Sequence, residues 1–192
     1  MTEQSKCCQS KKRIIIGIDP GLHVTGYGVI WSKNSQQGCI TFGQITPQSK
    51  SLNCRLHQIE EGLCDIIASY QPEEAAIEKI FTFRNHQSAL TLGQARGVAL
   101  SATASVCILP TAEYSARQIK KTVVGYGAAT KAQVQYMIRM LLQLEKIPSA
   151  DAADALATAV CHARFPFDQK TDTYTKKISS VAKEVLEVKF FN

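Results

Sequence analysis

Seven residues near the start of the chain, Arg-Ile-Ile-Ile-Gly-Ile-Asp at 13–19, constrain the fold more than any other segment. Their apolar, mostly β-branched side chains predict a strand that is buried on both faces. Pro20 and Gly21 follow directly and predict a turn. A strand of this kind needs covering layers on both sides of its sheet, as in an α/β fold, and Asp19 is expected to end it.

The segments that follow predict a mixed sheet flanked by helices. Strand-like runs at 26–32 and 39–45 flank a polar, hairpin-type loop, so three consecutive strands are expected to be antiparallel. Apolar residues then recur at helical spacing behind Ser51, before a fourth strand at 75–78. The remaining predicted elements are helices at 86–104, 111–121, after Thr130 and at 150–164, the last one capped by Ser149, and a fifth strand at 105–110.

The composition fits one cytoplasmic domain of ordinary size. The chain has 192 residues, 45% of them apolar, and a formal net charge of +6. No window approaches the 18 or more apolar residues of a membrane span, and the polar N-terminus lacks the apolar core of a signal peptide. The sequence predicts one domain at 13–167, between a basic N-terminal tail at 1–12 and a Lys-rich tail at 168–192.

Seven cysteines raise the question of a disulfide framework. Their number is odd, their spacing is irregular, and no Cys-x-x-Cys pair occurs. We therefore expect free thiols that pack as small apolar residues, rather than disulfides, a zinc site or a thiol nucleophile.

Four carboxylates occupy positions where the pattern favours apolar residues. Asp19 ends the first strand, and Glu78 ends the strand predicted to be its parallel neighbour. Asp151 and Asp154 lie three residues apart on one face of a helix rich in alanine. Burying several carboxylates together is unfavourable unless cations balance them, and Mg²⁺ or Mn²⁺ prefers such oxygen ligands. Two such ions about 4 Å apart can activate a water and stabilise the leaving oxygen of a phosphodiester.

Each acid also has an ordinary structural explanation, which is weakest for Asp154, one turn further into its helix. Asp19 is a common residue before a Pro-Gly turn, and Glu78 is a plausible strand-end charge beside Lys79. Asp151 lies in the first turn of a helix, where the helix dipole favours negative charge. The metal-site interpretation requires that all four converge in space, which the sequence does not establish.

Several segments, in order, resemble motifs of the RuvC family of bacterial Holliday junction resolvases. The first is Ile-Ile-Gly-Ile-Asp-Pro-Gly-Leu-His-Val-Thr-Gly-Tyr-Gly-Val-Ile at 15–30, and the last is Asp-Ala-Ala-Asp-Ala-Leu-Ala at 151–157. Between them, similar motifs occupy 77–81, 85–97, 113–120 and 122–125. The resemblance covers residues 13–164.

The resemblance implies a ribonuclease-H-like fold and a homodimer that resolves four-way DNA junctions by paired symmetric nicks, in recombination and repair. The family's metal-binding acids correspond to Asp19, Glu78, Asp151 and Asp154, which would hold two Mg²⁺ ions per subunit, with Mn²⁺ as a substitute. Four-way junction DNA and the RuvA–RuvB branch-migration complex are the implied partners.

The resemblance also assigns residues to the DNA. Phe81 corresponds to the aromatic residue that acts on junction bases, and Lys120 and Lys131 to basic residues near the scissile phosphate. The alternatives are a core phenylalanine and solvated surface lysines. His23 departs from the family, which commonly has arginine there, so we expect at most a weak phosphate contact from it.

Smaller features have structural interpretations. Gly93 and Gly97 are expected to allow close helix contact, with a dimer interface as one setting for it. His86 and His162 are expected to make ordinary structural hydrogen bonds.

Two other functions remain open at this point. A different ribonuclease-H-like nuclease, acting on RNA or RNA–DNA hybrids, would need the same carboxylates. A non-catalytic junction-binding module would keep the fold without the chemistry, although the complete set of acids argues against it.

Overall fold

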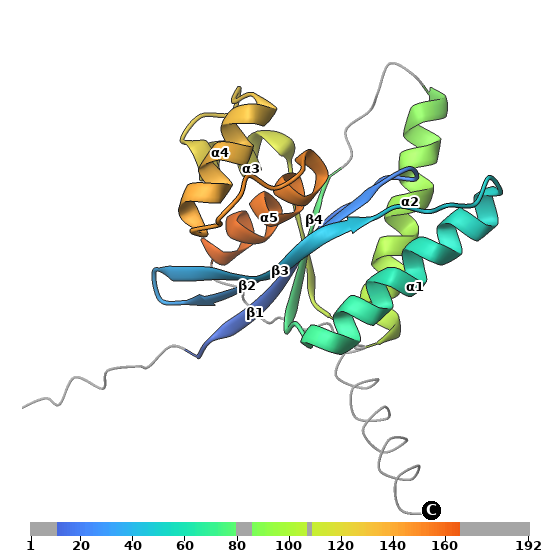
Figure 1. Ribbon diagram of the computed structural model, residues 1–192, viewed down its shortest axis with the longest axis horizontal. Coiled ribbons are helices and arrows are strands. Elements are labelled where there is room, and N and C mark those ends of the chain that lie inside the picture. The colour runs from blue at the N-terminus through green and yellow to red at the C-terminus, as the bar shows by residue number, and fades with distance from the viewer. Residues whose placement is uncertain (1–10, 80–85, 107–108, 166–192) are drawn as a thin grey trace, which may run out of the picture.

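Five strands form one mixed sheet in the order β3-β2-β1-β4-β5, in a computed structural model that describes residues 11–79, 86–106 and 109–165 (Figure 1). The strands are β1 (Arg13–Asp19), β2 (Thr25–Lys33), β3 (Gln36–Ile45), β4 (Glu74–Glu78) and β5 (Thr111–Tyr114). The helices are α1 (Leu52–Tyr70), α2 (His86–Ser105), α3 (Ala116–Val124), α4 (Lys131–Leu141) and α5 (Ala150–Ala163).

The pairing of the strands puts β1 at the centre of the sheet and confirms that the strand ending at Glu78 is its parallel neighbour. This strand pairs antiparallel with β2 and parallel with β4, and β2 pairs antiparallel with β3. Asp19 lies opposite Gly26 of β2, and Gly26 lies opposite Gln44 of β3. Because β1 and β4 are parallel, Asp19 and Glu78 end their strands at the same edge of the sheet.

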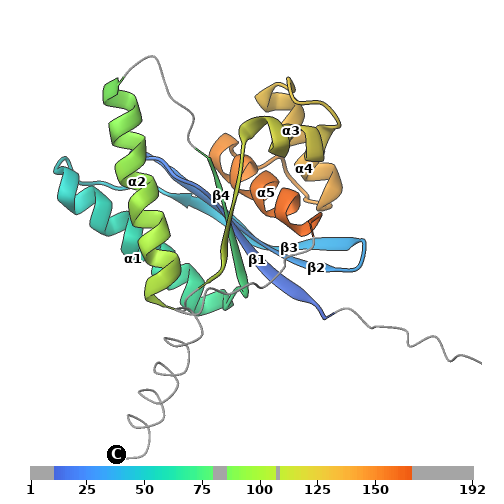
Figure 2. The same cartoon turned by 180° about the vertical axis from the view of Figure 1, so that it is seen from behind.

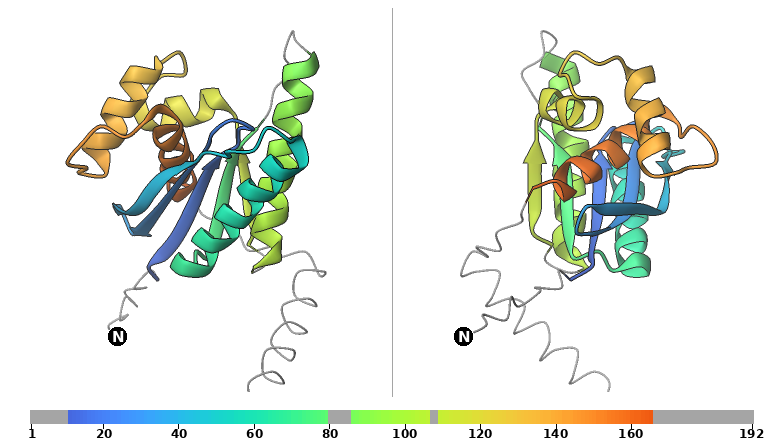
Figure 3. Two further views of the ribbon diagram at one scale, coloured as in Figure 1. Left: turned by 45° about the vertical axis from the view of Figure 1, so that its right-hand side comes forward. Right: turned by 90° about the vertical axis from the view of Figure 1, so that its left-hand side faces the viewer.

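Helices cover both faces of the sheet, which explains why β1 is apolar throughout. Helices α1 and α2 lie on one face, and α3, α4 and α5 lie on the other (Figures 2 and 3). Ile16 and Ile18 of β1 join the apolar core on the α1–α2 side, whereas Ile15 joins the core that contains α5. Among the described residues, no helix is long and apolar enough to cross a membrane.

Helix α5 lies directly on the sheet because glycines face it. A Cβ atom added to Gly17 would lie 2.1 Å from the Ala155 carbonyl oxygen, and one added to Gly26 would lie 2.1 Å from the Asp151 carbonyl oxygen. Real Cβ atoms do not approach backbone so closely, so these positions exclude any side chain. The close contact brings the first turns of α5 over the ends of β1 and β2.

The predicted fifth strand at 105–110 and the predicted start of a helix at Thr111 are wrong. Helix α2 continues to Ser105, and the strand is Thr111–Tyr114, directly after Pro110. The apolar run before Pro110 resembled a buried strand, whereas β5 is a half-exposed edge strand that needs little apolar content. A capping box between Ser115 and Gln118 then starts α3 at Ala116.

Most of the other helix predictions are confirmed, with differences in how the helices are capped. Thr130 caps α4 through a capping box with Gln133. Ser51 and Ser149 occupy the N-cap positions of α1 and α5, but neither side chain makes a capping hydrogen bond.

The smaller predictions have mixed outcomes. The four described cysteines, Cys39, Cys54, Cys64 and Cys161, are free thiols as expected, but the packing prediction is wrong for Cys54, which is exposed. A Cβ atom added to Gly93 or Gly97 would meet nothing within 4 Å, so the predicted close contact of these glycines with another helix is wrong within the chain. The side chain of His86 lies outside the described residues, as do most of the two predicted tails.

Candidate active site

Three elements bring four carboxylates to one edge of the sheet. Asp19 and Glu78 end neighbouring parallel strands, and Asp151 and Asp154 project from the first two turns of α5. All four side chains are half-buried. The helix reaches this edge because Gly26, the cross-strand neighbour of Asp19, lies under the backbone of Asp151.

Asp19 is the most perturbed of the four acids. Partial burial and, after it, the negative charges of Asp154, Glu78 and Asp151 together raise the pKa of Asp19 from 3.8 to about 7. All three of the other acids therefore lie close enough to repel the Asp19 carboxylate. Because ionising four neighbouring carboxylates is electrostatically unfavourable, this cluster favours a bound cation at this edge of the sheet.

Two lysines offset part of that repulsion. The Lys131 Nζ atom lies 3.5 Å from Asp154 Oδ2, and Asp154 in turn raises the pKa of Lys131. Burial raises the pKa values of Glu78 and Asp154, while the positive charges of Lys120 and Lys131 lower both. The two predicted phosphate-binding lysines are therefore neighbours of the carboxylates.

The donor set suits a hard divalent cation, because it consists of carboxylate oxygens alone. In the part of the chain that the structure describes, no three His, Cys, Asp or Glu side chains surround one point closely enough to hold an ion together. The four carboxylates are thus neighbours that repel one another without meeting at a single point.

Two polar contacts at this edge were not found by sequence reasoning. Gln44 of β3 donates a hydrogen bond from Nε2 to Asp151 Oδ2, at 2.6 Å. Arg55 of α1 donates from Nη1 to His23 Nδ1, at 2.8 Å, because a guanidinium can only donate. Neither glutamine nor arginine stands out in a polar strand or an amphipathic helix, so no local signal marked them.

Phe81, the residue expected to act on junction bases, lies outside the described residues. This stretch of described residues ends at Lys79, one residue beyond Glu78. The assignment of Phe81 therefore remains a prediction.

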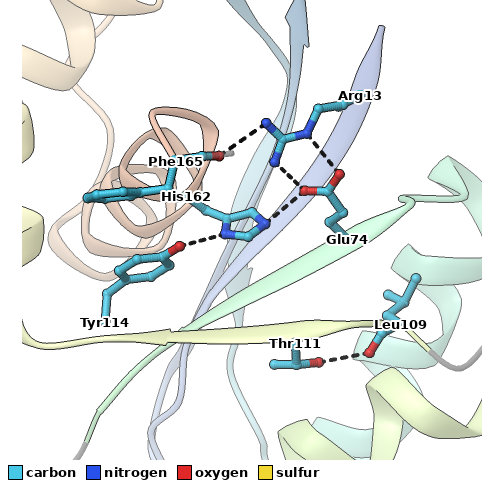
Figure 4. A network of polar contacts seen from close by, with 7 residues as sticks. All are labelled: Arg13, Glu74, Leu109, Thr111, Tyr114, His162 and Phe165. Atoms are coloured by element: carbon cyan, nitrogen blue, oxygen red, sulfur yellow. Dashed lines mark hydrogen bonds and ion pairs between the residues drawn. The ribbon is translucent and has the colours of Figure 1, made fainter. Parts of the chain in front are cut away.

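A second polar cluster lies at the opposite end of β1 and β4 (Figure 4). Glu74 accepts hydrogen bonds from Arg13 through both carboxylate oxygens and lies 2.8 Å from His162 Nε2. The other ring nitrogen of His162 lies 2.8 Å from the Tyr114 hydroxyl, and Arg13 also donates to the Phe165 carbonyl. The expectation that His162 makes structural hydrogen bonds is confirmed.

Comparison with known proteins decides the family. The model of the family described as crossover junction endodeoxyribonuclease RuvC matches residues 15–162. The chain belongs to the RuvC family. A crossover junction endodeoxyribonuclease RuvC from Coxiella burnetii is 71% identical over 152 residues, which are 79% of this chain and 88% of that protein. Another, from Shewanella baltica, is 56% identical over 149 residues, 78% of this chain and 86% of the relative.

Solved structures confirm the predicted ribonuclease-H-like α/β fold of this RuvC-family chain. RuvC of T. thermophilus, in complex with a Holliday junction substrate, matches with a TM-score of 0.73 and 30% identity, over 79% of this chain and 93% of that one. The yeast mitochondrial Holliday junction resolvase Ydc2 matches with a TM-score of 0.55, over 78% of each chain. Its identity is 12%, so this second likeness concerns the fold alone.

Proposed function

We propose that this chain is a metal-dependent endonuclease that resolves four-way DNA junctions by paired symmetric nicks. The observation that carries the proposal is that Asp19, Glu78, Asp151 and Asp154 lie near one another at one edge of the sheet in a RuvC-family chain, close enough for the other three to act on the charge of Asp19. The names of its relatives add support, since a RuvC with 30% identity binds a Holliday junction substrate.

In this proposal the four carboxylates hold Mg²⁺, two ions per subunit, and Mn²⁺ is a substitute. Bound there, the ions would activate the attacking water and stabilise the leaving 3′ oxygen. The chain itself supplies the carboxylate oxygens and two lysine side chains beside them. Lys131, next to Asp154, and Lys120, near Glu78, would stabilise negative charge that develops on the scissile phosphate.

The helices beside the acids offer a surface for the DNA backbone. Between Tyr114 and Leu144 the sequence contains no Asp or Glu, and its charged residues are Arg117, Lys120, Lys121, Lys131 and Arg139. A hollow formed by α3 and the segments that flank it is lined by Ser115, Arg117, Gln118, Lys121, Gly125, Tyr126 and Gly127. Basic groups around an exposed aromatic ring suit a phosphate backbone and its bases, so we propose that this hollow binds part of the junction DNA.

Removal of two charges from the hollow tests that assignment. Arg117→Ala combined with Lys121→Ala is expected to weaken junction binding. The slope of the logarithm of the binding constant against the logarithm of salt concentration should become shallower by about two, because two phosphate contacts are lost. Fluorescence anisotropy at several salt concentrations measures both quantities. Lys11→Ala combined with Lys33→Ala removes equal charge at the other end of the sheet and should leave the slope unchanged.

We also propose that α2 forms a homodimer interface, which would give the two-fold arrangement that paired nicking of a junction needs. Leu90 is 58% exposed, and Gly93 and Gly97 leave open space one and two turns further along the helix. Leu90→Glu is expected to shift the protein toward monomers in analytical ultracentrifugation. Leu52→Glu, at an exposed position on α1, serves as the control and should leave the dimer intact.

Cleavage of three matched substrates tests the function directly. A mobile four-way junction, a linear duplex and an RNA–DNA hybrid are each incubated with Mg²⁺ or with EDTA. Symmetric, Mg²⁺-dependent nicking of the junction alone is the expected result. Preferential cutting of the hybrid would favour a different ribonuclease-H-like nuclease, and metal-independent binding without cutting would favour a non-catalytic junction-binding module.

The remaining proposals follow from family membership. The RuvA–RuvB branch-migration complex is the proposed protein partner, and the cytoplasm is the proposed location. Co-sedimentation of the three proteins on one synthetic junction would test the partnership.

A further inference from the structure

A further polar side chain, that of Gln44, lies at the edge of the sheet where the four carboxylates gather. Gln44, Gly26 and Asp19 are successive cross-strand neighbours on β3, β2 and β1. Gln44 Nε2 donates to Asp151 Oδ2 at 2.6 Å, across 107 residues of sequence. Gly26, on the strand between β3 and β1, carries no side chain, and the backbone of Asp151 fills the space above it. The edge strand can therefore reach the first turn of α5.

The contact that Asp151 makes differs in charge from the contact that Asp154 makes. Asp154 lies beside the cation Lys131, which reduces the net charge around it. Asp151 receives a hydrogen bond from a neutral amide, which orients the carboxylate without offsetting its charge. With Oδ2 engaged by Gln44, the orientation of Oδ1 is also fixed, and that oxygen is left to accept from another group or to bind a cation.

We infer that Gln44 is a positioning residue, which orients Asp151 so that one of its oxygens binds the metal ion. This inference rests on the proposed metal-dependent function, and it deepens that function by naming a residue outside the carboxylate set. In metal sites, hydrogen-bond donors to the ligands fix ligand orientation, and their loss commonly weakens metal binding about 10- to 100-fold.

A merely structural role would have a different signature. Gln44 is exposed on an edge strand, and a single exposed hydrogen bond contributes little to folding. Replacing it should therefore change metal affinity far more than the stability of the metal-free protein.

The test is direct Mn²⁺ titration of the full chain, monitored by electron paramagnetic resonance of the free ion. Gln44→Leu keeps a similar volume but cannot donate, and we expect it to weaken Mn²⁺ binding about tenfold. Its melting temperature without metal should equal that of the wild type. Gln36→Leu, an exposed glutamine at the other end of the same strand, is the matched control and should bind Mn²⁺ normally. Junction cleavage by Gln44→Leu should recover at high Mn²⁺ concentration.

The outcomes separate this inference from the proposed function. If Asp19→Asn loses Mn²⁺ binding while Gln44→Leu binds like the wild type, the metal site stands and the positioning role is wrong. A fall in metal-free melting temperature with unchanged affinity would make Gln44 structural. If the wild-type protein binds no Mn²⁺, the proposed metal site is wrong, and the role of Gln44 is wrong with it.

Discussion

Asp19→Asn is expected to lower Mg²⁺-dependent junction cleavage about a thousandfold or more. The substitution removes a charged oxygen ligand from the centre of the carboxylate cluster, where the other three acids all act on it. Stabilisation by a bound cation is worth several kcal/mol in the transition state, and about 4 kcal/mol corresponds to a thousandfold in rate. Single-turnover cleavage of a synthetic junction, at saturating protein concentration, measures the loss.

The same variant should be at least as stable as the wild type when no metal is present. Partial burial and three neighbouring negative charges disfavour the Asp19 carboxylate, and asparagine removes that charge while keeping the shape. Thermal unfolding in EDTA provides the comparison, and Asp65→Asn, on the exposed side of α1, is the control. A large drop in melting temperature for Asp19→Asn would mean that Asp19 supports the fold and that lost activity reflects unfolding.

Glu74→Gln is expected to lower the free energy of unfolding by about 3 kcal/mol at neutral pH. Glu74 is 4% exposed and accepts hydrogen bonds from Arg13, and it also lies beside His162. Glutamine keeps the volume but leaves the Arg13 guanidinium without its anion, and removing one partner of a buried ion pair typically costs about 3–5 kcal/mol. Chemical denaturation at pH 7 measures the change.

The effect of Glu74→Gln should disappear in acid. Burial alone would raise the pKa of Glu74, but hydrogen bonds from Arg13 and His162 outweigh it and lower the pKa from 4.5 to about 2. The folded carboxylate thus holds its proton less tightly than the unfolded one. Its contribution to stability is present above pH 4.5 and is lost as the pH falls toward 2.

Unfolding measured at several pH values from 7 to 2 checks this dependence. The difference between wild type and Glu74→Gln should shrink between pH 4.5 and pH 2. Glu73→Gln changes the adjacent, more exposed carboxylate, which pairs with Lys11, and should have little effect at any pH. A difference that stays constant across the range would show that Glu74 acts through packing rather than charge.

Local pattern in the sequence was sufficient for most of the fold. The isoleucine run of β1, the polar hairpin loop and the helical spacing after Ser51 each reflect burial over a few adjacent residues. The four carboxylates could be identified for the same reason, since each interrupts an apolar pattern. The prediction of β5 was wrong because an edge strand with one exposed side carries little of that pattern.

Only the tertiary structure decided which distant side chains meet. The contact between Gln44 and Asp151 joins residues that are 107 positions apart, and the contact between Glu74 and His162 joins residues 88 positions apart. Both depend on how closely α5 lies on the sheet, which the glycines at 17 and 26 permit. The sequence by itself determined which segments are apolar enough to be buried and which acids interrupt them. Their partners follow from long-range packing, because the side chains that meet there have no regular spacing along the chain.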